Sequence, residues 1–181
     1  MGNKRIVIGN RIPYKFFVTT GIGESAITQH AGSYHFALHN AGIEMCNIMT
    51  YSSILPCEAT QIDKPETLVH GSVMESIMAV CQGGMDDICS AGIIFAWLYD
   101  YKKITHAPKK IGGIVCEYAA NVDETSVRNK LHNALTELYT SNYSQYQMSE
   151  PTVITSSFIC KNKYGTSLVA LCFTEYIIPI L

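Results

Sequence analysis

Most of the apolar residues fall into short runs rich in β-branched and aromatic side chains, and this distribution constrains the fold more than any other feature of the chain. Such runs, bounded by glycine, proline and polar residues, are typical of β-strands. We therefore expect strands at Arg5–Ile8, Tyr14–Thr20, Met45–Ser52, Val69–Val80, Asp87–Leu98, Lys110–Tyr118, Val153–Cys160 and Ser167–Tyr176. Between them, Gly21–Ser25 is predicted to be a tight turn, and Pro56 is predicted to end the strand before it.

Two segments carry apolar residues at helical spacing instead. Gln29–Asn40 is predicted to be a helix that stops at Gly42. Asn121–Tyr139 is the clearest helix, because Val127, Leu131 and Leu135 repeat every four residues. More strands than helices, without a repeat or an interdomain linker, predict one α+β domain over residues 1–181.

The composition narrows the classes of function. Only 15% of the 181 residues are charged, against about 25% in an average soluble protein, which predicts surface buried between subunits. The net charge is −2 and no basic run exceeds two residues, so nucleic acid is not an expected partner. No apolar stretch is long enough for a membrane span, and the start does not resemble a signal peptide, so we expect a cytoplasmic protein. The seven cysteines form no C-x-x-C pair and are expected to be buried free thiols.

Two adjacent serines, Ser52 and Ser53, follow a strand-like run and precede Pro56. The hydroxyl of Ser53 could attack the carbonyl of Ser52 and convert the amide into an ester through an oxyanion. Elimination and hydrolysis would then cut the chain and leave a ketone at its new end. Asn47 is the neutral side chain on offer as a donor to that oxyanion. On chemistry alone, an ordinary strand end with solvated hydroxyls is the favoured explanation of the pair.

Three blocks in this order resemble the pyruvoyl-dependent arginine decarboxylases, and together they extend over nearly the whole chain. They are ALHNAGI (37–43) with Asn47 and SSILP (52–56), then HGSVMESIMA (70–79), and then GGIVCEY (112–118). The resemblance implies a four-layer αββα sandwich, assembled as homotrimers that pair into hexamers, with active sites between neighbouring subunits.

The resemblance also implies self-cleavage into a β chain, 1–52, and an α chain, 53–181. The α chain would begin with a covalent pyruvoyl group made from Ser53, which forms a Schiff base with an amino-acid substrate. Glu117 matches the family's proton donor, and Asn47 matches its helper in cleavage. From these roles we expect Glu117→Gln to cleave normally and to decarboxylate poorly. The implied reaction converts L-arginine into agmatine and carbon dioxide.

The substrate pocket departs from the family pattern at one position. Leu38 and Ile54 match apolar positions that line the substrate's methylenes, although both could equally be core residues. The family usually places an aspartate before this alanine-leucine pair to bind the guanidinium, and here that residue is His35. Another acid could supply the charge, and the candidates are Glu24, Glu44 and Glu75.

Two further interpretations remain open at this point. The chain could be a pyruvoyl-dependent decarboxylase of another amino acid, or an uncleaved, inactive paralogue with a structural or regulatory role. A metal site is not expected: His35 and His39 lie four residues apart, but the residue after His35 is Phe36, not the glutamate of zinc proteases.

Overall fold

The computed structural model describes residues 9–101 and 108–179, so the strand predicted at Arg5–Ile8 lies outside the described residues. The strands are β1 (Ile12–Ser25), β2 (Asn47–Thr50), β3 (Ile54–Pro56), β4 (Thr60–Gln61), β5 (Val73–Gly83), β6 (Ile88–Asp100), β7 (Lys109–Ala120), β8 (Gln147–Met148), β9 (Thr152–Ile159) and β10 (Tyr164–Ile177). The helices are η1 (Gln29–Tyr34), a π-helix that continues directly into α1 (His35–Ala41), and α2 (Glu124–Asn142). The predicted α+β class is confirmed.

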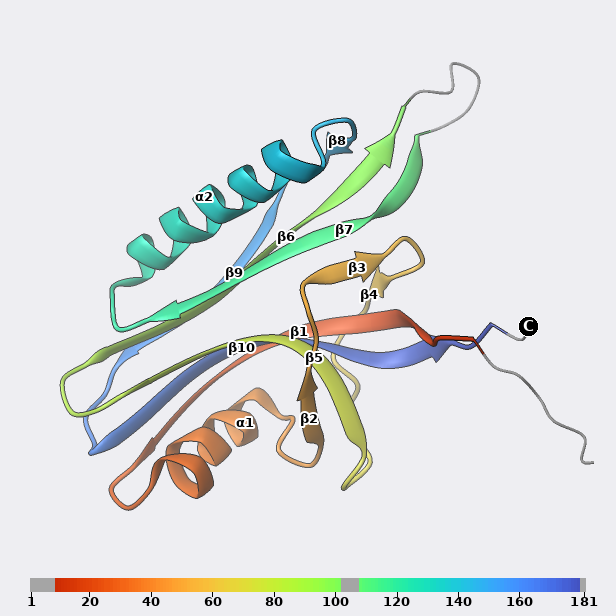
Figure 1. The fold of residues 1–181 in the computed structure, drawn as a ribbon. Coiled ribbons are helices and arrows are strands. Elements are labelled where there is room, and N and C mark those ends of the chain that lie inside the picture. The colour runs from red at the N-terminus through yellow and green to blue at the C-terminus, as the bar shows by residue number, and fades with distance from the viewer. Residues whose placement is uncertain (1–8, 102–107, 180–181) are drawn as a thin grey trace, which may run out of the picture.

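The strands form two sheets that face each other (Figure 1). The first sheet has the order β2-β5-β10-β1-β4, and the second has the order β3-β7-β6-β8, with β9 also paired to β6. Helix α1 covers the outer face of the first sheet, and helix α2 covers the outer face of the second (Figure 1). Both faces of the central strands are therefore buried, which explains why β10 is buried without interruption over residues 165–173 and apolar over residues 168–173.

The largest apolar cluster lies between the two sheets. Phe16 of β1 contacts Phe95, Trp97 and Phe173 with ring centroids 6.0 to 6.3 Å apart. All seven cysteines lie among the described residues as free thiols, and five of them are buried, as expected. Burial raises the pKa of the Cys172 thiol to about 12, so this cysteine is chemically inert at neutral pH. None of the helices within the described ranges is long and apolar enough to cross a membrane.

The turn predicted at Gly21–Ser25 is wrong, because this segment continues strand β1. Its two glycines allow η1 and α1 to approach the strand. A Cβ atom at Gly21 would lie 2.0 Å from the carbonyl oxygen of Ala37, and one at Gly23 would lie 2.3 Å from that of Ser33. The glycines are therefore there for close packing and not for a change of chain direction.

The chain changes sheets at the serine pair. The strand predicted over Met45–Ser52 ends at Thr50, whose partner in β5 is Ser76. The Tyr51 N–H donates to the Ser76 carbonyl in the first sheet, and the Ser53 carbonyl accepts from Val115 N–H in the second. Pro56 does not end the earlier strand, because Ile54–Pro56 forms β3 against β7. Ser52 thus lies at the crossing between the sheets.

We predict that Gly21→Ala lowers the free energy of unfolding by about 3 kcal/mol, because the added methyl overlaps a helix carbonyl that cannot move independently. Urea denaturation followed by circular dichroism measures the change. Gly84→Ala is the matched control, since its Cβ would meet nothing closer than 3.5 Å. Equal stability of the two variants would contradict the packing role of Gly21.

Candidate functional site

Ser53 and Glu117 form the best-defined polar contact near the serine pair. The Ser53 hydroxyl lies 2.9 Å from Oε1 and 2.7 Å from Oε2 of Glu117, so it donates to the carboxylate. Residues 64 positions apart meet here because β3 pairs with β7, with Ile54 opposite Ile114. The side chains of Val115 and Glu117 lie on the same face of β7. Val115 is part of the core between the sheets, and Glu117 is exposed at the margin of that core. A carboxylate in this position can take the hydroxyl proton.

The carbonyl of Ser52 also has a donor on its oxygen. The N–H of Ile54 lies 2.9 Å from it and closes a three-residue turn centred on Ser53. This carbonyl is the one that the Ser53 hydroxyl would attack, and a backbone N–H on its oxygen would stabilise the negative charge that develops there. Sequence reasoning missed this donor, because a backbone group leaves no signal in a residue pattern.

Asn47 begins β2 and is exposed. Its side-chain amide donates to the Gly71 carbonyl at 3.0 Å, and its backbone N–H donates to the Ser72 carbonyl. In this chain the Asn47 amide therefore holds the loop before β5. Its role as a donor to the oxyanion stays a prediction.

His35 and Leu38 lie together on the helix. They line an open cavity of about 420 Å³, which we call the α1 cavity; its other lining residues are His30, Ala31 and Tyr34. Ile54 lies elsewhere, in a smaller cavity of about 180 Å³ between β3, β7 and the end of α2. The structure of one chain therefore joins Ser53 to Glu117, but it leaves Asn47, the α1 cavity and Ile54 at separate places.

The three candidate acids have different surroundings. Glu24 accepts the backbone N–H groups of Lys161 and Asn162. Glu75 is buried and forms an ion pair with Arg11. Glu44 accepts from His39, with Oε1 and Nδ1 3.1 Å apart.

The pKa of the Glu44 carboxyl group lies below the ordinary value for a glutamate. Its partial burial would raise its pKa, but a hydrogen bond to its own backbone, the hydrogen bond to His39 and the nearby rings of His39 and His35 outweigh burial and lower it.

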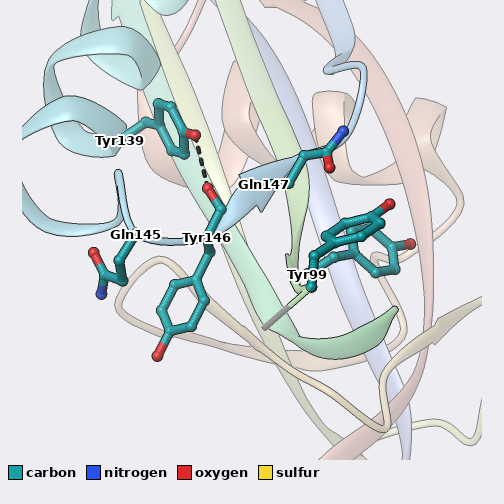
Figure 2. Close-up of a pocket in the computed structure, with 6 residues that line it drawn as sticks. Tyr99, Tyr139, Gln145, Tyr146 and Gln147 are labelled. Atoms are coloured by element: carbon teal, nitrogen blue, oxygen red, sulfur yellow. Dashed lines mark hydrogen bonds between the residues drawn. The ribbon is translucent and has the colours of Figure 1, made fainter. Parts of the chain in front are cut away.

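Another open cavity of about 420 Å³ lies at the end of helix α2 and is lined by tyrosine and glutamine side chains (Figure 2). The Tyr139 hydroxyl donates to the Tyr146 carbonyl at 2.7 Å, which ties the helix to the segment before β8. None of the residues that the sequence singled out for function lines this cavity.

Comparison with known proteins supplies independent information. A family model described as pyruvoyl-dependent arginine decarboxylase matches residues 15–177. The chain is 28% identical over 189 aligned positions to a pyruvoyl-dependent arginine decarboxylase of Chlamydia caviae, covering 93% of this chain and 94% of that protein.

Two other relatives match over a shorter stretch. A probable pyruvoyl-dependent arginine decarboxylase of Chlorobaculum parvum is 37% identical over 71 residues, which cover 38% of each protein. A pyruvoyl-dependent arginine decarboxylase of Methanocella arvoryzae is 35% identical over 71 residues, 38% of this chain and 42% of that relative. The chain therefore spans less than half the length of these two relatives.

Proposed function

Because the chain belongs to the pyruvoyl-dependent arginine decarboxylase family, we propose that it cleaves itself between Ser52 and Ser53 and then decarboxylates L-arginine to agmatine and carbon dioxide. The products of cleavage are a β chain, 1–52, and an α chain, 53–181. The observation that carries this proposal is the hydrogen bond from the Ser53 hydroxyl to the Glu117 carboxylate.

Cleavage begins when Glu117 takes the Ser53 hydroxyl proton and the Ser53 oxygen bonds to the Ser52 carbonyl carbon. The Ile54 N–H stabilises the oxyanion. The bond from that carbon to the Ser53 nitrogen then breaks, the nitrogen takes up a proton, and an ester links the two residues. Loss of the Ser53 α-proton expels Ser52 as a carboxylate and leaves dehydroalanine at position 53. Water then replaces its nitrogen, releasing ammonia and leaving a ketone.

The surroundings of Ser53 fit the pyruvoyl group that this sequence of steps would produce. The Ser53 carbonyl, which becomes the amide carbonyl beside the ketone, accepts the Val115 N–H at 3.1 Å. Once formed, the group would supply an electrophilic carbonyl for the substrate's α-amine and an acceptor for the electron pair released with carbon dioxide. The Val115 N–H would hold the amide oxygen beside the ketone, and Glu117 would hold the proton intended for the substrate's α-carbon.

A second copy of the chain is needed to complete the site. We place the α1 cavity of one subunit against Ser53 of its neighbour. In this arrangement each subunit has the four-layer αββα sandwich of the family, and the subunits assemble as its trimer or hexamer. Two exposed apolar surfaces support this arrangement. One lies on and beside β2 and consists of Met45, Met49, Val69 and Val73; the other lies on the end of β1, on the turn before η1 and on α1, and consists of Ile22, Ile27 and Phe36. Exposed apolar patches that differ in composition are expected where subunits join head to tail in a closed ring.

We predict that the protein purifies as two fragments, 1–52 and 53–181, and that a hydrazine adds only to the larger one. Ser53→Ala should remain one unreactive chain, because it lacks the attacking hydroxyl. Ser52→Ala is the matched control and should still cleave, since only the Ser52 carbonyl takes part. Intact mass spectrometry under denaturing conditions separates these outcomes. An uncleaved wild-type chain would favour the inactive paralogue.

Glu117→Gln is predicted to slow cleavage about a hundredfold and decarboxylation at least as much, because an amide cannot take the Ser53 proton. The sequence alone predicts normal cleavage for Glu117→Gln, and the contact between Glu117 and the Ser53 hydroxyl is the reason for the different expectation here. The half-time of fragment appearance after translation measures the first effect, with Glu137→Gln on α2 as control. Cleavage at the wild-type rate would restrict Glu117 to the later proton transfer.

Shared active sites predict that two inactive variants restore each other. Ser53→Ala lacks the reactive group, and His35→Lys places a positive charge in the α1 cavity. Co-expressed subunits that mix at random should recover about a quarter of wild-type activity, the fraction of sites with Ser53 and His35 both intact. Recovery at the level of either homomeric variant would contradict a site built from two copies.

A further inference from the structure

The α1 cavity lacks the group that a cationic substrate needs. Its five described lining residues include two histidines and one tyrosine, but no acid. A planar guanidinium is bound most strongly by a carboxylate, which offers a negative charge and two acceptors. At the position of the family aspartate stands His35, which carries no negative charge in any protonation state. If this cavity receives the arginine side chain, its negative charge must come from a neighbouring residue.

Two of the three candidate acids are engaged in holding the fold. Glu24 accepts two backbone N–H groups at the β9–β10 turn, so its carboxylate already stabilises that turn. Glu75 is 2% exposed and its Oε1 is paired with Arg11. Because an unpaired buried carboxylate is strongly unfavourable, the Arg11 guanidinium cannot leave Glu75 without cost. Only Glu44 combines an accessible carboxylate with histidine neighbours that belong to the cavity or adjoin it.

The end of helix α1 places Glu44 beside the row of histidines. Gly42 adopts a left-handed conformation with a φ of 70°, and the Ile43 N–H returns to the Leu38 carbonyl. This turn brings Glu44 back onto the last helical turn, where its side chain is 22% exposed and accepts from His39. His35 and His39 lie one turn apart on the same helix face, so the negative charge lies at the end of a row that leads into the cavity.

We propose that Glu44 is the residue that makes the α1 cavity selective for a cationic side chain, in place of the family's aspartate. This inference rests on the proposed function. Glu44 acts as a positioning residue: it fixes the His39 ring through Nδ1 and supplies a negative charge near His35, whose ring accepts one hydrogen bond from the guanidinium. Because Glu44 attracts the charge of the substrate's side chain and does not touch the reacting carbon, it governs binding more than turnover.

Steady-state kinetics on the cleaved enzyme tests this with L-arginine and L-citrulline, a neutral molecule of nearly the same shape. Glu44→Gln should raise the KM for arginine about tenfold or more, while kcat stays within about twofold. The KM for citrulline should not change, because no charge interaction is lost. Glu137→Gln removes a carboxylate from the exposed face of helix α2. It is the matched control and should leave the KM of both substrates unchanged. An unchanged ratio of arginine to citrulline KM in Glu44→Gln would overturn the inference.

A double variant separates a charge effect from a local distortion. Adding His35→Asp to Glu44→Gln returns a carboxylate directly to the cavity, and should restore the preference for arginine if charge is what Glu44 supplies. Failure to restore it would contradict the electrostatic role.

Failure of the proposed function is recognised separately, by a wild-type enzyme that does not turn over arginine. Calorimetry then measures the affinity of the uncleaved Ser53→Ala protein for arginine and for citrulline. A preference for arginine that disappears in Ser53→Ala/Glu44→Gln upholds the inference. Equal affinity of Ser53→Ala for the two ligands overturns it.

Discussion

The crossing of the chain between the two sheets is the constraint on which the candidate site depends. Tyr51 is hydrogen-bonded to β5 on one side and Ser53 to β7 on the other, so the peptide between Ser52 and Ser53 is anchored at both ends. Tyr51 also packs its ring on Phe173, with centroids 5.7 Å apart, at the margin of the core between the sheets. The peptide between Ser52 and Ser53 therefore takes its position from the burial that holds the two sheets together.

The polar groups at this crossing contribute little to stability, and the role that we propose for them is chemical. An exposed hydroxyl–carboxylate bond such as Ser53–Glu117 is worth about 1 kcal/mol or less to the fold. By contrast, the donor already in place on the Ser52 carbonyl would act where negative charge develops in the proposed cleavage, and such a donor is worth roughly a hundredfold or more in rate. The same geometry would serve both proposed reactions, since Glu117 contacts the Ser53 hydroxyl in the uncleaved chain and would lie beside the group made from Ser53 after cleavage.

Sequence patterns predicted the long elements because those elements carry their own periodicity. Helix α2 shows its stripe of Val127, Leu131 and Leu135, and all three are buried against the second sheet. The pattern failed where a partner far along the chain decides the structure. Gly21 is in a strand because β10 pairs with it, and β3 exists because β7 offers an edge. The candidate residues Ser53 and Glu117 were identified from sequence, but their contact depends on pairing across 64 positions.

The pairing of β1 with β10 would give the proposed cleavage a thermodynamic consequence. A cut after Ser52 would leave β1, η1, α1 and β2 on one fragment and all later elements on the other. Strand β1 is paired with β10 from Ile12 to Ser25, so the short fragment would remain threaded through the first sheet. Unfolding would then release two molecules from every processed chain, and refolding would become bimolecular. The mature protein would melt at a temperature that depends on its concentration, whereas the uncleaved subunit could regain its own fold alone.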